Sequence, residues 1–176
     1  LIDDATTNEV VKERLSQPDA ANGAIFDGYP RTPAQADWLE NYLEGKGEHV
    51  NIALLLDLDL YTAFKRAFGR MTQPDTNKSY NIYYNADGLE WQFIDHPDQS
   101  FPPRLKGVEQ GTGKELVRRP DDASAHAIIK RIDIYTETTK PLIDYYRGKG
   151  LLKTIDANQP IPVVSDAIKA ALEAAK

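Results

Sequence analysis

Residues 26–32 read FDGYPRT, and the prediction of the fold begins with this stretch. It continues the short apolar run at residues 23–26, which a glycine and a proline then interrupt. We therefore predict a buried strand that stops at a sharp turn. Asp27 would lie at the carboxyl end of that strand, where open α/β sheets bind ligands.

A helix is predicted directly after this turn. Thr32 suits the N-cap position, Pro33 the first helical position, and Gln35 the position from which a side chain caps back onto the N-cap residue. Arg31 precedes the helix start, so its guanidinium can project over the crevice beside the strand end.

Helices and strands alternate along most of the chain. Residues 51–57 form an apolar run without alternation, which is typical of a strand covered on both faces of a parallel sheet. We predict a doubly wound α/β fold with right-handed crossovers. The helix that opens the chain is expected to start at a capping box made by Thr6 and Glu9. Further helices are predicted over 61–68, 122–139 and 163–175, with a short one after residue 141, and a further strand over 151–155.

The segment 70–119 lacks hydrophobic periodicity and is rich in Pro, Gly, Asn, Asp and Tyr. Loops of this length are usually functional lids or disordered. Residues 86–106 of this segment include aromatic and proline residues, and when such residues are exposed they often mark contacts with partners. We expect polar side chains to tie the segment together by hydrogen bonds, namely Gln73, Thr76, Glu109 and Thr112.

Composition excludes several classes of protein. The net charge of −6 argues against a broad basic face for nucleic acid, although a phosphate site needs only a few converging arginines. No run approaches the roughly 18 apolar residues that would span a bilayer. The 176 residues include no cysteine, which excludes disulfides and thiolate zinc sites and favours the cytoplasm or another reducing compartment.

Several motifs resemble those of adenylate kinases. DGYPRT with Gln35 resembles the DGFPRT…Q signature of that family, with tyrosine for phenylalanine. Residues 66–70, RAFGR, resemble the R-x-x-G-R at the start of the family's ATP lid, and residues 112–122 resemble the lid exit. The resemblance covers the whole chain except the middle of the lid. It implies a P-loop kinase type of α/β fold with an inserted lid: a core part with the AMP-binding segment at 1–69, the ATP lid at 70–119 and the rest of the core at 120–176.

The resemblance also implies roles for individual residues in the reaction of ATP with AMP to give two ADP. Arg31 and Gln35 would hold the AMP phosphate and adenine, and Ile2 and Thr7 would form the wall of the base pocket. Arg66 would pack on the ATP adenine. The residues expected around the transferring phosphoryl group and its lid are Arg70, Arg119, Arg131, Asp121 and Asp122.

Asp27 would orient the water shell of a Mg²⁺ ion that accompanies ATP. The sequence departs from the family at Met71, where a second arginine is common, and has one extra residue before Arg131.

The 176 residues contain no G-x-x-x-x-G-K-S/T phosphate loop, which such kinases need to cradle phosphates. Aligned on the family, the chain begins partway through the AMP-binding region. We therefore expect a separate segment or chain to supply the phosphate loop and a central strand between residues 24–26 and 52–58. Two alternatives stay open here: a non-catalytic kinase-like scaffold within a larger assembly, and a kinase for another nucleoside monophosphate.

Overall fold

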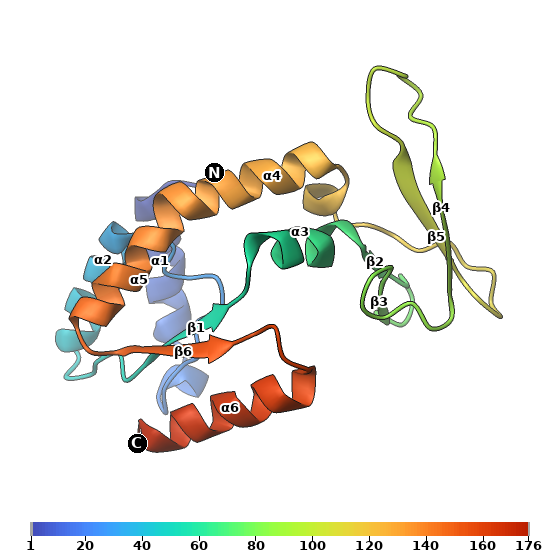
Figure 1. Cartoon of the computed structure of the whole chain (residues 1–176). Helices are drawn as coiled ribbons and strands as arrows, with labels where there is room; N and C mark the ends of the chain where they lie inside the picture. Colours follow the sequence, from blue (N-terminus) through green and yellow to red (C-terminus); the bar gives the residue numbers. More distant parts are fainter. Residues whose placement is uncertain (1, 176) are drawn as a thin grey trace. The chain divides into compact units, whose positions relative to one another are not determined.

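A computed structural model describes residues 2–175, and the chain divides into two compact units that are described separately (Figure 1). Unit 1 is discontinuous and comprises the residues up to Asp57 together with those from Ile134 onward. Unit 2 is the continuous stretch Leu58–Asp133. The functional division of the sequence into core and lid parts stays a prediction.

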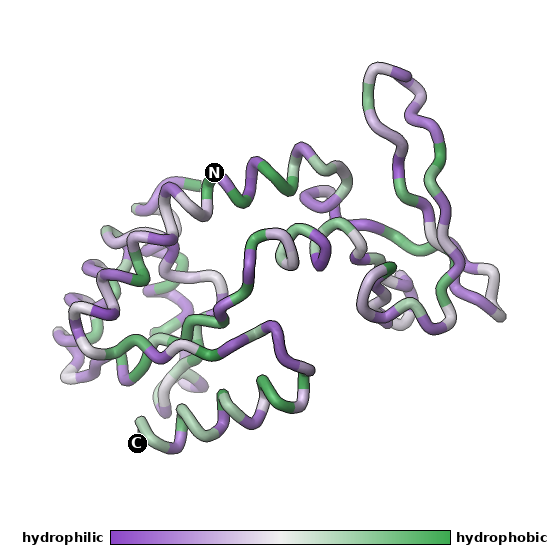
Figure 2. The backbone as a smooth tube through the Cα atoms, in the orientation of Figure 1, coloured by the Kyte–Doolittle hydropathy of each residue, from purple (hydrophilic) through white to green (hydrophobic). Residues whose placement is uncertain are grey.

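Unit 1 combines a parallel pair of strands with helices. Strand β1 (Ala53–Asp57) pairs in parallel with β6 (Leu152–Asp156), with Ala53 opposite Leu152 and Asp57 opposite Asp156. The run around β1 is a continuous hydrophobic stretch, green in Figure 2. The other elements are α1 (Asp4–Leu15), the 3-10 turn η1 (Pro18–Ala20), α2 (Pro33–Glu44), the π-helical turn η3 (Tyr135–Thr139), α5 (Lys140–Gly148) and α6 (Ile161–Ala174).

The core of unit 1 lies between α2, α5 and the strands. Ala36, Leu142 and Tyr146 are its buried centre, and Ala53 and Leu152 pack against them. The parallel pairing predicted for this apolar run is confirmed. Because a parallel pair needs a long crossover between its strands, the pairing also joins two distant parts of the chain.

Capping side chains explain where the helices begin. Thr32 caps α2 by accepting a hydrogen bond from the Gln35 backbone N–H at 3.1 Å, as predicted. The capping box predicted at Thr6 and Glu9 is wrong: α1 begins earlier, and Asp3 is its N-cap, accepting from the Thr6 backbone N–H at 2.8 Å. A carboxylate offers the helix end a charged acceptor, which favours Asp3 in this position.

The strand predicted at residues 23–26 is also wrong. These residues have no regular secondary structure, and Ile25 is 90% exposed. A strand forms only where another strand satisfies its backbone groups. Within residues 2–175 the sheet of unit 1 contains only β1 and β6, so residues 23–26 have no strand beside them.

Unit 2 contains α3 (Leu60–Phe68), two antiparallel hairpins, and the start of the next helical segment. The first hairpin pairs β2 (Arg70–Thr72) with β3 (Ser79–Asn81), and the second pairs β4 (Leu89–Ile94) with β5 (Arg104–Glu109). The 3-10 turn η2 (Pro120–Asp122) precedes α4 (Ala125–Ile134). The segment 70–119, in which the sequence showed no hydrophobic periodicity, is therefore not a loop throughout, because four strands lie within it.

Side chains from both hairpins form the core of unit 2. Met71 and Tyr80 come from the first hairpin, Leu89 and Leu105 from the second, and Leu116 from the segment that follows. Tyr80 is only 1% exposed. Helix α3 starts at the N-cap Asp59 and ends before Gly69, as the sequence predicted for its end. No helix in the described part of the chain is both long and apolar enough to cross a membrane.

Candidate functional site

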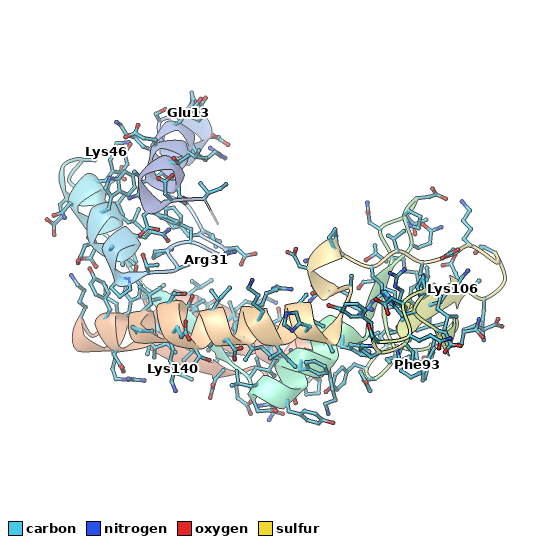
Figure 3. All side chains as sticks on the ribbon, turned by 90° about the horizontal axis from the view of Figure 1, so that it is seen from above. Glu13, Arg31, Lys46, Phe93, Lys106 and Lys140 are labelled. Carbon is cyan, nitrogen blue, oxygen red and sulfur yellow. The ribbon has the colours of Figure 1, made fainter. Side chains whose placement is uncertain are left out.

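Arg31 lies in the loop before α2 (Figure 3), and two hydrogen bonds hold it there. Its backbone N–H donates to Gln35 Oε1 at 2.7 Å, and its Nε donates to the Gly28 carbonyl oxygen at 2.8 Å. Gly28 has a φ of 74°, and a Cβ there would lie 3.1 Å from Arg31 Nη2. Only glycine combines this backbone conformation with the close approach of the guanidinium. Arg31 itself is exposed, so its outer N–H groups face solvent.

Gln35 is 6% exposed and forms the centre of a polar cluster. Its Nε2 donates to Asp4 Oδ1 at 2.8 Å, and Thr32 Oγ1 donates to Asp4 Oδ2 at 3.1 Å. The cluster joins the first turn of α1 to the first turn of α2. The sequence placed Gln35 correctly in the first turn of α2, but its predicted cap onto Thr32 is wrong, because the amide oxygen accepts from Arg31 instead.

Tyr29 supplies a second link between these segments that the sequence reasoning missed. Its hydroxyl donates to Asn8 Oδ1 at 2.7 Å, and Asn8 is 8% exposed. Burial, with smaller effects of Tyr146 and Asp4, raises the pKa of Tyr29 to about 12. The sequence did contain a clue to this contact, because Tyr29 places a hydroxyl where the DGFPRT signature has phenylalanine.

The remaining predicted residues of unit 1 differ in exposure. Thr7 is half-buried on α1, and its Oγ1 donates to the Asp3 carbonyl oxygen at 2.9 Å. Ile2 is 73% exposed, and Asp27 is exposed in the turn before Tyr29. Asp27 thus offers its carboxylate to solvent.

In unit 2, Asp122 brings two of the predicted arginines together. The Asp122 side chain is fully buried; its Oδ1 accepts from Arg131 Nη1 at 2.6 Å, and its Oδ2 lies 3.3 Å from Arg70 Nε. The second contact is an ion pair without hydrogen-bond alignment, so Oδ2 has no hydrogen-bond donor among the described residues. The two guanidinium groups reach solvent, with side chains 30% exposed for Arg70 and 52% for Arg131. One buried carboxylate thus holds two partly exposed cations.

The other predicted residues of unit 2 lie near this cluster in sequence but make different contacts. Arg66 lies over the Tyr84 ring at 5.8 Å from the ring centroid, and its carbonyl oxygen accepts from Asn81 at 3.0 Å. Arg119 caps the turn η2 by its position, and Arg119 and Asp121 are exposed. Neither side chain takes part in the ion pairs of Asp122.

Arg118 is a structural residue of this region that was not singled out from the sequence. Its Nη2 donates to the Phe68 carbonyl oxygen at 2.6 Å, and its Nη1 donates to the Ala123 carbonyl oxygen at 3.1 Å. The guanidinium also lies 5.1 Å from the centroid of the Phe68 ring. Burial lowers the pKa of Arg118. Arg118 therefore connects the end of α3 with the turn before α4, and a pair of adjacent arginines was its only signal in the sequence.

Hydrogen bonds tie the hairpins together, as expected from their polar residues. The Tyr80 hydroxyl donates to Glu109 Oε1 at 2.6 Å, and Thr112 Oγ1 donates to Glu109 Oε2 at 2.8 Å. These two hydrogen bonds lower the pKa of Glu109, and the bond from Tyr80 has the larger effect. Gln73 Oε1 accepts from the Thr76 backbone N–H at 2.8 Å, which holds the turn of the first hairpin.

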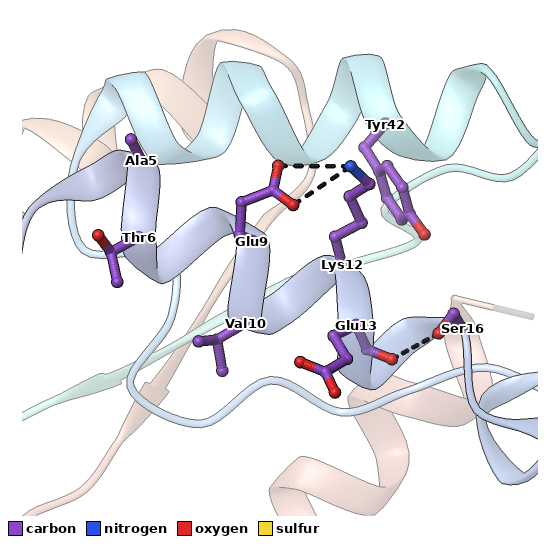
Figure 4. A pocket seen from close by; sticks show the side chains of 8 residues that line it. All are labelled: Ala5, Thr6, Glu9, Val10, Lys12, Glu13, Ser16 and Tyr42. Atoms are coloured by element: carbon purple, nitrogen blue, oxygen red, sulfur yellow. Dashed lines mark hydrogen bonds and ion pairs between the residues drawn. The ribbon is translucent and has the colours of Figure 1, made fainter.

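Two surface hollows lie outside the predicted site residues. One is a shallow groove along α1, where Lys12 pairs with Glu9 beside Tyr42 (Figure 4). The other lies in unit 2 between aromatic side chains, including Phe68 and Phe101, and Arg118. Neither hollow contains a residue of the predicted site. Among residues 2–175, no three His, Asp or Glu side chains gather as a metal site.

An α/β architecture with a parallel strand pair, and arginines held by carboxylates and glutamine, fits a kinase of the P-loop type. The adenylate kinase family model matches residues 1–151. The chain is similar to the adenylate kinase of Moorella thermoacetica, with 38% identity over 98% of this chain and 71% of that protein. It is also similar to the adenylate kinases of Acholeplasma laidlawii, with 37% identity over 98% of this chain and 72% of that protein, and of Shouchella clausii, with 36% identity over 98% and 71%.

The chain therefore belongs to the adenylate kinase family. It is a nucleoside monophosphate kinase, an enzyme that transfers a phosphoryl group between ATP and AMP. The family membership favours the enzyme over the non-catalytic scaffold.

Proposed function

We propose that the two clusters of polar residues hold the two nucleotides of the adenylate kinase reaction. In unit 1, Arg31 binds the phosphate of AMP, and Gln35 faces its base, with Ile2 and Thr7 beside the base. In unit 2, Arg70, Arg119 and Arg131 surround the phosphoryl group in transfer, and Arg66 packs on the adenine of ATP. Asp121 and Asp122 position these arginines.

The convergence of Arg70 and Arg131 on Asp122 carries this proposal. Phosphoryl transfer depends mainly on positioning and on stabilising charge spread over the phosphoryl oxygens. A buried carboxylate fixes the inner side of each guanidinium and leaves its outer N–H groups available for phosphate oxygens. Planar guanidinium groups suit this task, because their donors match the geometry of phosphate.

Asp27 is the residue that would hold Mg²⁺ through its water shell. Its exposed carboxylate fits this task, because Mg²⁺ keeps several waters and binds through one or two carboxylates and the substrate phosphates. When bound with ATP, the ion neutralises charge that develops on the phosphates.

We also propose that a strand and a phosphate loop from outside these 176 residues complete the site. No phosphate-loop motif occurs in this sequence. Ile25 is 90% exposed and Leu56 of β1 is 50% exposed, so both neighbours of the predicted strand position present apolar surface to solvent. Burying that surface would stabilise the sheet by about 25 cal/mol for each Å². The missing element could belong to the same polypeptide or to another chain.

The test is a coupled assay for ADP formation from ATP and AMP. It is run on the chain alone and on the chain joined to a segment that carries a strand and a phosphate loop. We expect turnover in the joined form, and a loss of about 10³-fold or more in kcat for Arg70→Ala or Arg131→Ala. Lys130→Ala serves as the matched control, because Lys130 is an exposed neighbour on α4.

Binding measurements test the monophosphate half separately. Isothermal titration of AMP should show that Arg31→Ala abolishes detectable binding, while Arg147→Ala, on the exposed side of α5, leaves it unchanged. Full activity of Arg70→Ala, or no turnover in either form of the chain, would overturn the proposal. Tighter binding of CMP or UMP than of AMP would assign the chain to another nucleoside monophosphate.

A further inference from the structure

The two partners of the Gln35 side chain define which end of its amide is oxygen and which is nitrogen. A carboxylate offers only acceptors, so the atom that contacts Asp4 Oδ1 at 2.8 Å is the NH₂ group. A backbone N–H offers only a donor, so the atom that contacts Arg31 N at 2.7 Å is the oxygen. The two contacts agree, and each would become repulsive if the amide rotated by half a turn.

A primary amide has two donor positions and two acceptor positions. Asp4 occupies one donor of Gln35, and Arg31 occupies one acceptor. One N–H and one lone pair therefore stay available for a ligand. Thr32 strengthens this arrangement, because its hydroxyl donates to the other Asp4 oxygen at 3.1 Å and accepts from the Gln35 backbone N–H at 3.1 Å.

A base with an amino group beside a ring nitrogen offers the complement of this pair. The 6-amino group of a purine donates to the amide oxygen, and the neighbouring ring nitrogen accepts from the amide N–H. A 6-oxopurine offers the opposite pattern on the same edge, with an acceptor at position 6 and a donor at position 1. It could satisfy Gln35 only if the amide rotated, and rotation would set the amide oxygen against Asp4 and the NH₂ group against Arg31 N–H.

We infer that Asp4 is a specificity-determining residue that fixes the Gln35 amide and so selects 6-aminopurine monophosphates over 6-oxopurine monophosphates. This inference rests on the proposed function, in which Gln35 faces the base of the monophosphate. Asp4 acts through Gln35 and is a positioning residue. Its charge belongs to the first turn of α1, where a carboxylate also stabilises the helix, so the test must separate the two effects.

The experiment measures the binding of AMP and IMP to the full chain by isothermal titration. These nucleotides differ in the donor and acceptor pattern at positions 1 and 6. We expect the chain to favour AMP by about tenfold or more, since mismatched hydrogen bonds at a buried polar site are strongly rejected. In Asp4→Asn the new side chain can donate to a rotated Gln35, so the ratio of the two dissociation constants should fall by about fivefold or more.

The fall should come chiefly from tighter binding of IMP. A merely structural role of Asp4 would weaken both nucleotides equally and leave their ratio unchanged. Asp3→Asn is the matched control, because it changes a neighbouring carboxylate while keeping an N-cap acceptor. Asp4→Ala, with circular dichroism to monitor folding, provides a second variant in which only the Arg31 backbone N–H still opposes rotation of the amide.

The outcomes distinguish this inference from the proposed function. A chain that binds neither nucleotide would overturn the proposed function and this inference with it. A chain that favours AMP, and keeps the same ratio within about twofold in Asp4→Asn and Asp4→Ala, would overturn the inference alone. If Asp3→Asn changed the ratio of the two dissociation constants as much as Asp4→Asn does, the inference would also be contradicted, since Asp3 does not contact Gln35.

Discussion

Replacement of Asp122 by asparagine tests whether one buried charge holds the arginine cluster of unit 2. The variant keeps the volume of the side chain and an acceptor oxygen for Arg131, but it removes the negative charge. Arg70 and Arg131 then contact a buried side chain that carries no opposite charge. The free energy of unfolding of unit 2 should fall, and the loss should be largest at low salt.

The magnitude follows from the exposure of the three side chains. Breaking a buried ion pair by removing one partner costs about 3–5 kcal/mol, whereas an exposed pair contributes about 0–1 kcal/mol. Asp122 is 0% exposed, but the two arginine side chains are 30% and 52% exposed and can regain water. We therefore expect a loss of about 2 kcal/mol, between these two limits.

The assay is urea unfolding followed by tryptophan fluorescence. Trp38 lies in unit 1 and Trp91 in unit 2, so Trp38→Phe leaves a tryptophan only in unit 2. In that background, Asp122→Asn should lower the urea midpoint by roughly 1–2 M, given a slope of about 1–2 kcal/mol per M for a small unit.

Asp121→Asn is the control, because Asp121 is the exposed neighbour in the same turn. It should change the stability by less than about 0.5 kcal/mol. A loss below about 0.5 kcal/mol for Asp122→Asn, or equal losses in both variants, would refute the reasoning. A double-mutant cycle with Arg131→Gln should give a coupling of about 1–2 kcal/mol, since the two side chains are bonded directly.

Two further predictions concern the hairpins and the segment that follows them. The pKa of Glu109 is lower in the folded chain than in the unfolded chain, so its ionised form stabilises unit 2 at pH values above its unfolded pKa. Tyr80→Phe should therefore lower the urea midpoint at pH 7, and this difference should shrink as pH falls to about 3. Equal differences at both pH values would contradict the prediction. Arg118→Lys keeps the charge but cannot bind the carbonyl groups of both Phe68 and Ala123, so it should lower the free energy of unfolding of unit 2 by about 1–2 kcal/mol in urea unfolding. The exposed control Arg147→Lys should cost less than about 0.5 kcal/mol. A loss for Arg118→Lys as small as that of the control would contradict the structural role of Arg118.

Local sequence patterns predicted the helices and the parallel strand pair well. The apolar run that became β1 and the N-cap Thr32 are local signals whose outcome depends on few other residues. Asp3 replaced the predicted capping box because it stands one turn earlier and offers a charged acceptor. These differences concern element boundaries, where alternative caps compete within a few residues.

Patterns that depend on distant partners were not predictable in this way. The strands β2 and β3 contain three residues each, which is too short for a periodic signal, and Tyr80 is buried by side chains from another hairpin. Conversely, residues 23–26 have the composition of a strand, but the described part of the chain gives them no strand to pair with.

The candidate site shows the same contrast between local signals and contacts that join distant segments. Motifs selected Arg31, Gln35, Arg70, Asp122 and Arg131 from the sequence, and the structure places the last three in one cluster. The roles of Asp4, Asn8 and Arg118 depend on contacts between separate segments, which spacing in the sequence does not reveal.

The division into a continuous and a discontinuous unit has a consequence for biosynthesis. A ribosome that has translated the chain through Asp133 has supplied every residue of unit 2, but β1 still lacks β6. Unit 2 can therefore fold during translation, while the sheet of unit 1 must wait for the last part of the chain. Until then β1 lacks its partner β6, and an apolar strand with an unpaired edge is the kind of segment that chaperones bind.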